Sequence, residues 1–267
     1  MSLLTQTLKV LILLFIILVF FTYCFQRYLI YFPSPTIPQP HDFGATDLTV
    51  LKLQTKDNLS LNAWYKSASA NHPTVLILHG NAGTIGNRMA LAREFINAGF
   101  GVLLLEYRGY GGNKGSPTEQ GLYNDGQAAV SFLTQQGVKP TQLVLYGESL
   151  GTGVASKLAT ESPSCALILQ SPFTSLTSIA HYSYPWIPLD PWDKFDSLSR
   201  IKEINTALLI LHGIKDPIVP YSEGLTLFKA AAEPKQMLSF QNYGHNNLWD
   251  AKNFYKQVIH FITLHCS

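Results

Sequence analysis

A serine stands between two glycines in the string GESLG at residues 147–151. The string follows strand formers at 142–146 and precedes a small-residue segment typical of a helix. A serine on a sharp strand-to-helix turn has strained backbone angles, and the residues two before and two after it are forced so close that a Cβ on either would collide. Gly147 and Gly151 therefore predict a nucleophile elbow that presents the Ser149 hydroxyl at a helix N-terminus. A serine that only caps the helix is the alternative.

Serine at its ordinary pKa is a poor nucleophile, so it needs a base within hydrogen-bond reach. Of the eight histidines, His245 lies in the loop between the last predicted strand and the last predicted helix. We expect His245 to be this base, with an ordinary surface histidine as the alternative. His79 and His212 each end an apolar run as His-Gly, and we expect both to bond loop backbone.

The base needs a carboxylate that fixes its tautomer and offsets its positive charge. Asp216 follows the apolar run at 207–212 and lies between the serine and the histidine in sequence. The sequence therefore predicts a triad of Ser149, Asp216 and His245, and a turn-forming Asp-Pro pair is the alternative role for Asp216. The rival carboxylates lie in an irregular stretch rather than at a strand end: Asp190, Asp193 and Asp196.

Acyl transfer also needs two N–H donors for the oxyanion that forms on the attacked carbonyl. The backbone N–H of Leu150, directly after the serine, is one candidate. The backbone N–H of Asn81, in the string HGNAGTIG after the first predicted parallel strand, is the other. These glycines do not follow a G-x-G-x-x-G or Walker A pattern, which argues against a phosphate loop. Because no HExxH or paired CxxC occurs, we expect no catalytic metal and no cofactor.

The elements that must position these residues have two signatures. Residues 47–55 and 59–65 alternate apolar and polar, which predicts an antiparallel hairpin. Later apolar runs, such as TVLILHG and ALLILHG, are continuous and predict parallel strands buried on both faces. The fold class is therefore α/β, a doubly wound and mostly parallel sheet. The helices between the strands are expected at 87–98, 118–136, 149–160, 221–232 and 248–264.

The front of the chain predicts a transmembrane helix within residues 1–30. The apolar stretch 10–25 would span about 24 Å as a helix, and Lys9 and Arg27 bracket it. A cleaved signal peptide needs a small-x-small site, which this stretch does not offer, and a buried core helix is the third alternative. A small charge bias favours a domain outside the membrane. Residues 31–45 hold four prolines and are expected to form a stiff spacer before a domain at 46–267.

An irregular, aromatic-rich stretch at about 172–203 predicts a short insertion over the carboxyl edge of the sheet, where ligands bind in open α/β folds. Its rings are expected to line an acyl pocket, and the alternative is that they only pack the insertion onto the domain. These candidate substrate-binding residues are Phe173, Tyr182, Tyr184, Trp186 and Trp192.

Composition excludes some partners. The net charge is +2 and the basic residues are scattered, so nothing points to nucleic acid. The cysteines at 24, 165 and 266 are few and far apart, and we expect no disulfide framework from them. No feature of the sequence specifies an oligomeric state.

Five strings in this order resemble the α/β-hydrolase superfamily: LILHGNAG, EYRGYGGNKGSP, LYGESLGTGVA, LHGIKDPIVP and YGHNNLW. The N-terminal anchor with HGNAG and YRGYG resembles the membrane-anchored α/β-hydrolase-domain branch, which includes protein depalmitoylases. This resemblance covers about residues 47–264 and implies the same nucleophile, acid, base and oxyanion donors. Glu106 stands where the branch often has aspartate, and we expect a structural role for it.

Together these features predict a membrane-anchored serine hydrolase that cleaves carboxylic esters or thioesters through an acyl-enzyme. The anchor favours lipid-like acyl groups because it holds the domain at their source. A peptidase is the alternative among enzymes, and a non-catalytic binding protein on a hydrolase fold is the alternative of another class.

Overall fold

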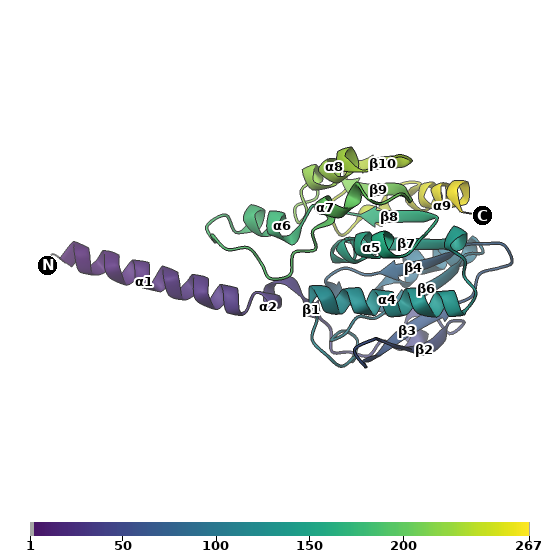
Figure 1. Cartoon of the computed structure of the whole chain (residues 1–267), viewed down its shortest axis with the longest axis horizontal. Coiled ribbons are helices and arrows are strands. Elements are labelled where there is room, and N and C mark those ends of the chain that lie inside the picture. The colour runs from purple at the N-terminus through teal and green to yellow at the C-terminus, as the bar shows by residue number, and fades with distance from the viewer. Residues whose placement is uncertain (1–2, 267) are drawn as a thin grey trace.

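The computed structural model describes residues 3–266 (Figure 1). An eight-stranded sheet in the order β10-β9-β8-β7-β4-β6-β3-β2 forms its centre. Strand β3 is antiparallel to β2 and to β6, and the other neighbours are parallel, which confirms the predicted α/β class and N-terminal hairpin. The strands are β2 (Thr49–Gln54), β3 (Ser60–Lys66), β4 (Thr74–Leu78), β6 (Gly101–Leu105), β7 (Leu143–Glu148), β8 (Ala166–Gln170), β9 (Ala207–Gly213) and β10 (Lys235–Phe240).

The central parallel strands, from β9 to β6 in the sheet order, are almost entirely apolar because both faces of the sheet are covered there, whereas the edge strand β10 is only partly buried. In β4, Val75 and Ile77 join the core cluster on one face, and Leu76 and Leu78 join the cluster on the other. Each side chain of this size contributes roughly 1.5–3 kcal/mol when fully buried. One face is covered by α3 (Met89–Asn97) and α9 (Phe254–His265), and the opposite face by α4 (Glu119–Gln135), α5 (Leu150–Glu161), α7 (Ser197–Ile201) and α8 (Tyr221–Ala230).

The helices expected between the strands lie close to the predicted positions, and the insertion adds α6 (Leu176–Ser183) and α7, which no periodic pattern predicted. The Thr118 side chain caps α4 by accepting a hydrogen bond from the Gly121 N–H at 2.9 Å. The helix expected at 248–264 is instead a 3-10 turn, η4 (Leu248–Asp250), followed by α9. Asn253 between them has a φ of 64°, a left-handed conformation that interrupts a helix. A second 3-10 turn, η2 (Ile85–Arg88), precedes α3.

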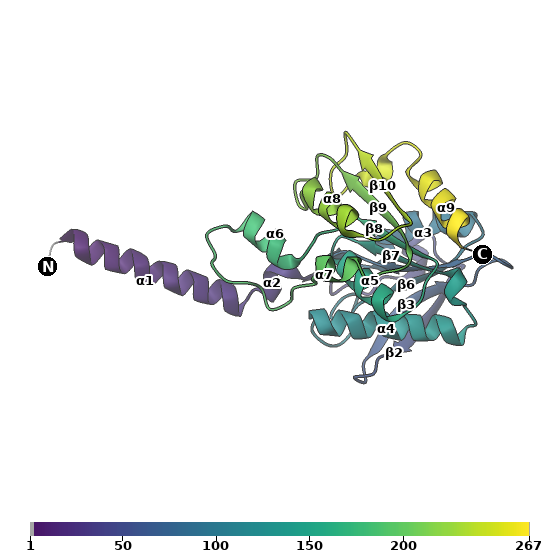
Figure 2. The same ribbon diagram turned by 45° about the horizontal axis from the view of Figure 1, so that its top comes forward.

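Helix α1 (Leu3–Cys24) projects away from the domain (Figures 1 and 2). Its 22 residues are about 33 Å long, and they are long and apolar enough to cross a membrane. None of its residues is buried. A single turn, α2 (Arg27–Ile30), connects it to the domain.

The expected spacer at 31–45 does not stand off the domain. Tyr31 is only 3% exposed and belongs to the core. Strand β1 (Phe32–Pro33) pairs in parallel with β5 (Ala82–Gly83). The 3-10 turn η1 (Pro40–Phe43) places the Phe43 ring 6.0 Å from that of Trp64. The prolines thus stiffen a strap that lies on the domain, because Tyr31 and Phe43 bury apolar surface there.

The cysteine spacing predicted no disulfide framework, but the structure contains one disulfide that the sequence did not reveal. Cys165 and Cys266 form a disulfide with a Cα–Cα distance of 5.2 Å. The pair joins the start of β8 to the end of α9, which are 101 residues apart in sequence. Sequence spacing could not reveal the pair because only the packing of α9 on the sheet brings the two residues together. Cys24 is free and exposed.

Candidate active site

The turn that carries Ser149 has the geometry its glycines predict. Ser149 has φ 50° and ψ −115°, between the end of β7 and the first residue of α5. A Cβ on Gly147 would lie 2.5 Å from the carbonyl oxygen of Gly151, and one on Gly151 would overlap the Leu78 carbonyl oxygen. Only glycine fits at both positions, so the predicted steric reason for the motif is confirmed. Such backbone strain costs of order 1–3 kcal/mol and persists where the surrounding structure imposes it.

The structure brings Ser149, His245 and Asp216 together. The Nε2 atom of His245 lies 2.9 Å from the Ser149 Oγ, and its Nδ1 lies 2.7 Å from Asp216 Oδ2. These residues come from three loops at the carboxyl ends of β7, β9 and β10. Parallel strands place those ends at one edge, so residues 96 and 29 positions apart become neighbours.

The Asp216 carboxylate is held in one orientation. Its Oδ1 accepts hydrogen bonds from the N–H groups of Ile218 and Val219, both at 2.9 Å. Burial alone would raise the pKa of Asp216, but His245 and these two amides lower it below its ordinary value. The carboxylate is therefore charged at neutral pH and suited to stabilise a protonated imidazole.

The other two strand-end histidines are structural, as predicted. His212 is fully buried, its Nε2 lies 3.0 Å from the Val219 carbonyl oxygen, and burial lowers its pKa. It therefore supports, in neutral form, the loop that carries Asp216. The His79 Nδ1 lies 2.7 Å from the Gly80 carbonyl oxygen.

The loop after β4 places Asn81 beside the elbow. The Asn81 carbonyl oxygen accepts hydrogen bonds from the Phe32 N–H and the Tyr110 hydroxyl, each at 2.9 Å. Its side-chain Nδ2 donates to the Ile30 carbonyl oxygen at 3.1 Å. Within residues 3–266, no hydrogen bond engages the backbone N–H of Asn81 or of Leu150. Both candidate oxyanion donors are therefore available to a ligand.

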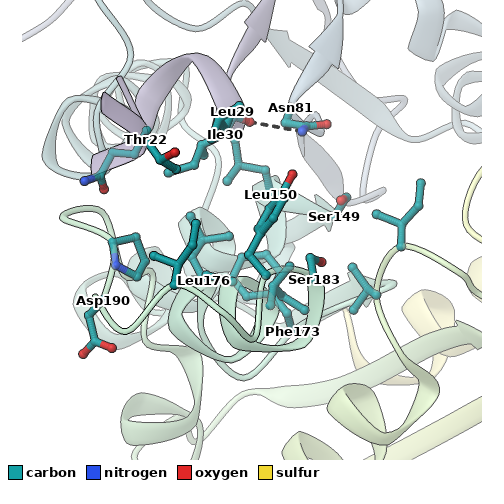
Figure 3. Close-up of a pocket in the computed structure, with 18 of the residues that line it drawn as sticks. Thr22, Leu29, Ile30, Asn81, Ser149, Leu150, Phe173, Leu176, Ser183 and Asp190 are labelled. Atoms are coloured by element: carbon teal, nitrogen blue, oxygen red, sulfur yellow. Dashed lines mark hydrogen bonds between the residues drawn. The ribbon is translucent and has the colours of Figure 1, made fainter. Parts of the chain in front are cut away.

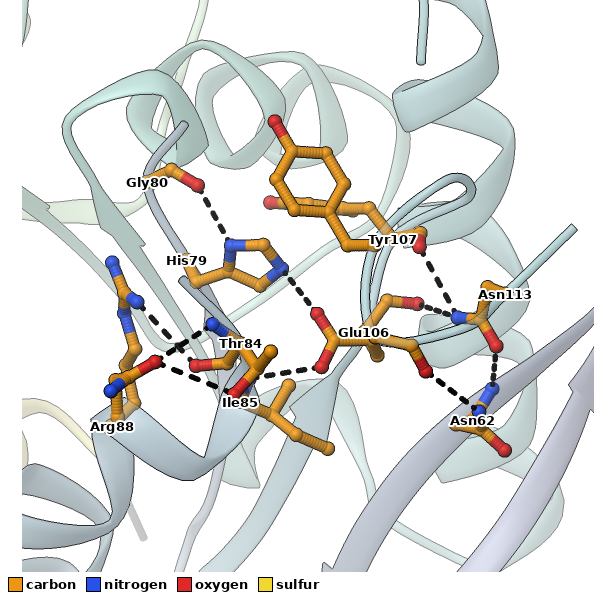
Figure 4. A network of polar contacts seen from close by, with 12 residues as sticks. Asn62, His79, Gly80, Thr84, Ile85, Arg88, Glu106, Tyr107 and Asn113 are labelled. Atoms are coloured by element: carbon orange, nitrogen blue, oxygen red, sulfur yellow. Dashed lines mark hydrogen bonds and ion pairs between the residues drawn. The ribbon is translucent and has the colours of Figure 1, made fainter. Parts of the chain in front are cut away.

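A buried polar network stabilises this loop (Figure 4). Glu106 is fully buried, its Oε2 accepts a hydrogen bond from the Ile85 N–H at 3.0 Å, and its Oε1 lies 3.3 Å from His79 Nε2. Asn113 donates to the Glu106 carbonyl oxygen at 2.8 Å. The structural role expected of Glu106 is confirmed by these contacts, which lie behind the loop rather than in the site.

Arg88 and Glu148 form a contact that sequence reasoning missed. The Arg88 guanidinium donates to both carboxylate oxygens of Glu148, at 2.9 and 2.8 Å, and to the Ala82 carbonyl oxygen at 2.9 Å. Glu148 directly precedes Ser149, and Ala82 directly follows Asn81. Arg88 therefore connects the elbow to the loop with the second oxyanion donor. A lone arginine in a helix-like segment gives no local signal of such a partner.

A cavity of about 450 Å³ lies above Ser149 (Figure 3). Ser149, Leu150 and Asn81 lie at one end of its wall. The rest of the lining is mostly apolar and comes from the insertion, from the Asp216 loop and from the end of the N-terminal helix. The lining residues used below are Tyr23, Gln26, Leu29, Ile30, Ile179 and Ile218.

The predicted aromatic residues divide into two groups. Phe173 and Tyr184 line the cavity. Tyr182, Trp186 and Trp192 are not among the described residues that line it, and they are 60%, 45% and 47% exposed. Trp186 and Trp192 instead contact α1, because α6 (Leu176–Ser183) and its following loop extend towards that helix.

Sequence comparison finds related proteins whose alignments cover between 70% and 92% of this chain. The family described as "Serine aminopeptidase, S33" matches residues 69–189. The uncharacterised protein Rv2307c of Mycobacterium tuberculosis is 39% identical over 92% of this chain and 90% of its own. Protein bem46 of Schizosaccharomyces pombe is 31% identical over 91% and 87%. The lysophosphatidylserine lipase ABHD12 of Rattus norvegicus is 36% identical over 70% of this chain and 52% of its own.

Solved structures agree in fold. The Pyrococcus furiosus esterase Pf2001 superposes with a TM-score of 0.72 at 18% identity, over 89% of this chain and 98% of its own. The α/β hydrolase GrgF from Penicillium superposes with a TM-score of 0.70 at 17% identity, over 82% and 98%. With the strand order, the elbow and the sequence relatives, these likenesses show that the chain belongs to the α/β-hydrolase superfamily, in the branch that contains bem46 and ABHD12.

Proposed function

We propose that this hydrolase is a membrane-anchored serine enzyme that cleaves carboxylic esters or thioesters of lipid-like acyl groups. The observation that carries the proposal is the 2.9 Å contact between Ser149 Oγ and His245 Nε2 at one end of a mostly apolar cavity. A serine beside a base whose other nitrogen contacts a carboxylate fits nucleophilic acyl transfer.

In this mechanism, His245 takes the proton from the Ser149 hydroxyl as its oxygen attacks the substrate carbonyl carbon. The N–H groups of Asn81 and Leu150 stabilise the tetrahedral oxyanion, and one such donor is worth about 3–4 kcal/mol. When the intermediate collapses, His245 gives its proton to the leaving oxygen or sulfur, and an acyl-enzyme remains. Water, deprotonated by the same histidine, then releases the acid and restores the serine.

The leaving group has to lie on the His245 side, because it receives its proton there. A second, more open cavity of about 480 Å³ lies at that position and shares Pro217 and Ile218 with the first. Its lining includes the polar residues Lys215, Asn242, Asn246 and Asn247 beside the apolar Pro217 and Ile218. The two cavities leave room for an acyl group on one side of Ser149 and a leaving group on the His245 side.

The membrane setting is supported by α1 and by the disulfide. A single span of this length suits a hydrocarbon core of about 30 Å. Disulfides persist in oxidising compartments, so the Cys165–Cys266 pair favours the domain on the non-cytoplasmic side. The charge bias of the helix flanks agrees with that orientation. The name lysophosphatidylserine lipase given to related proteins also favours a lipid substrate.

Turnover across an acyl series tests the proposed substrate class. Purified full-length protein is assayed with esters and thioesters from acetyl to palmitoyl, beside the Ser149→Ala variant and a peptide series. We expect activity to rise with chain length and to be lost in the variant. A preference for acetyl would refute the lipid-like class, and turnover of peptides alone would favour a peptidase.

A further inference from the structure

The last turn of α1 and the turn α2 that follows it, together called the helix end (residues 22–31), form part of the cavity wall. Tyr23, Gln26, Leu29 and Ile30 line the cavity on one side, and Ile179 from α6 lies among the residues of the insertion that line it. Figure 3 shows Leu29 and Ile30 near Asn81, and Leu176 within the same cavity lining. A simple tether would stand apart from the substrate site, whereas this helix end contributes side chains to it.

The helix end is fixed to the insertion by polar contacts that are buried or partly buried. Arg27 Nε donates to Asp193 Oδ2 at 3.0 Å, and the Tyr31 hydroxyl donates to the same carboxylate at 2.9 Å. The Asp193 side chain is only 6% exposed. The Gln26 Oε1 accepts a hydrogen bond from the Trp192 N–H at 2.6 Å. The two walls of the cavity are thus joined to each other at residues 26–31 and 192–193.

The loop after α6 follows the helix further towards the N-terminus. Residues 183–189 have the sequence SYPWIPL and carry no charge. The Trp186 ring lies 6.4 Å from that of Phe15, nine positions before the end of α1. At 1.5 Å per residue, the loop reaches about 13 Å along the helix. If α1 spans a bilayer, this tip lies within the hydrocarbon layer, where its exposed rings would be buried.

We propose that the cavity opens into the bilayer and receives the acyl chain of a lipid still seated in that membrane. This inference rests on the proposed function. The chain enters between the helix end and α6, with its carbonyl at Ser149 and its tail towards the hydrocarbon layer. Leu29 and Ile179, from the two walls, determine how long a chain the site accepts. Most of the lining is apolar, which favours a hydrocarbon chain, and the one acidic residue among the described residues that line it, Asp190, has a side chain that is 49% exposed.

Fluorescence quenching tests the position of the loop tip without using activity. Full-length protein is reconstituted into phosphatidylcholine vesicles with lipids brominated at mid-chain. We expect these lipids to quench the wild-type fluorescence, and the Trp186→Phe variant to lose most of that quenching. Trp249→Phe is the matched control, because Trp249 is half-buried against the core cluster that includes α9 and, among the described residues, has no ring contact with α1. Equal quenching in wild type and Trp186→Phe would overturn the proposal.

Chain-length selectivity tests the wall. Leu29→Trp narrows the cavity, and we expect the ratio of kcat/KM for palmitoyl over acetyl esters to fall at least 10-fold. Leu18→Trp is the matched control, because Leu18 is similarly exposed, at 51% against 47%, but does not line the cavity. Ile179→Trp, on the α6 side, should lower the ratio in the same way if Leu29→Trp misfolds.

Labelling by a small fluorophosphonate distinguishes a failure of the proposed function from a failure of the proposed membrane opening. If folded wild-type protein is not labelled at Ser149, the proposed function itself is contradicted. If Ser149 is labelled normally but the palmitoyl-to-acetyl ratio of kcat/KM changes equally in Leu29→Trp and Leu18→Trp, the result contradicts the membrane opening alone. A cavity that opens into the bilayer should give both the quenching result and the selectivity result.

Discussion

The Asp216 carboxylate illustrates how single residues are prepared for the proposed chemistry. Its two oxygens face different groups: one accepts two backbone N–H groups, and the other contacts His245. The amides orient the carboxylate and keep it charged, so the imidazole is held with Nε2 towards the serine. His212 contacts the same loop from the interior of the protein.

Replacing this carboxylate should cost activity more than stability. Asp216→Asn keeps the shape but favours the wrong imidazole tautomer, so we expect kcat to fall about 10³–10⁴-fold. Steady-state ester hydrolysis measures it. Asp196→Asn is the control, because asparagine can still cap α7 as Asp196 does. The kcat of this variant should stay within about twofold of the wild-type value. A comparable loss in Asp196→Asn with little effect in Asp216→Asn would favour the rival acid.

Buried His212 should make the domain less stable in mild acid. Burial lowers its pKa in the folded state, so the unfolded chain binds more protons as the pH falls below its ordinary value of about 6.5. Stability is therefore full above that pH and decreases as the pH falls towards the folded-state pKa. Thermal unfolding at pH 5 to 8 should show a shallower decrease for His212→Gln. A parallel decrease in both proteins would contradict this role.

Among the elements, the elbow and the loop after β4 depend on each other. Arg88 extends from η2 to the carboxylate before the nucleophile and to the carbonyl after Asn81. Both partners of the Arg88–Glu148 pair are nearly buried, with side-chain exposures of 12% and 13%. Removing one partner leaves a buried charge without compensation.

Arg88→Met should therefore lower the free energy of unfolding by about 3–5 kcal/mol. The double variant Arg88→Met with Glu148→Gln should recover much of the loss, because no buried charge remains. Denaturant unfolding of the wild type, the two single variants and the double variant measures the coupling free energy between Arg88 and Glu148. A double variant as unstable as Arg88→Met alone would show that the pair is not the cause.

Prediction from sequence worked where the physics is local. The parallel strands were predictable because burial on both faces requires continuous apolar runs. The elbow was predictable because the tight turn around Ser149 leaves no room for a Cβ at Gly147 or Gly151. The proximity of Ser149, Asp216 and His245 was predictable because each follows a strand at the same edge of the sheet. The partners of Arg88 and the positions of Trp186 and Trp192 were not predictable, because they depend on contacts between distant elements.

For the whole molecule, the helix, strap and domain form a connected structure rather than three separate parts. The strap adds β1 to the loop beside the site, and the helix end binds the insertion. At the other end, the Cys165–Cys266 disulfide holds the C-terminal helix to the sheet. The packing of the strap and of the helix end on the domain left no local trace in the sequence.

Loss of the disulfide should destabilise the domain without affecting the site. The bond closes a loop of about a hundred residues, and cross-links of this kind contribute roughly 2–4 kcal/mol. Thermal unfolding of Cys266→Ser should show a clearly lower Tm. Cys24→Ser is the control, since this cysteine is free and exposed. Identical melting of both variants would contradict a structural disulfide.

The most direct test of the central claim is to map the covalent adduct of a fluorophosphonate probe on the full-length protein by peptide mass spectrometry. The account predicts a single adduct on Ser149, abolished in Ser149→Ala and slowed strongly in a folded His245→Gln variant. An adduct on another residue, or no adduct on folded protein, would contradict it.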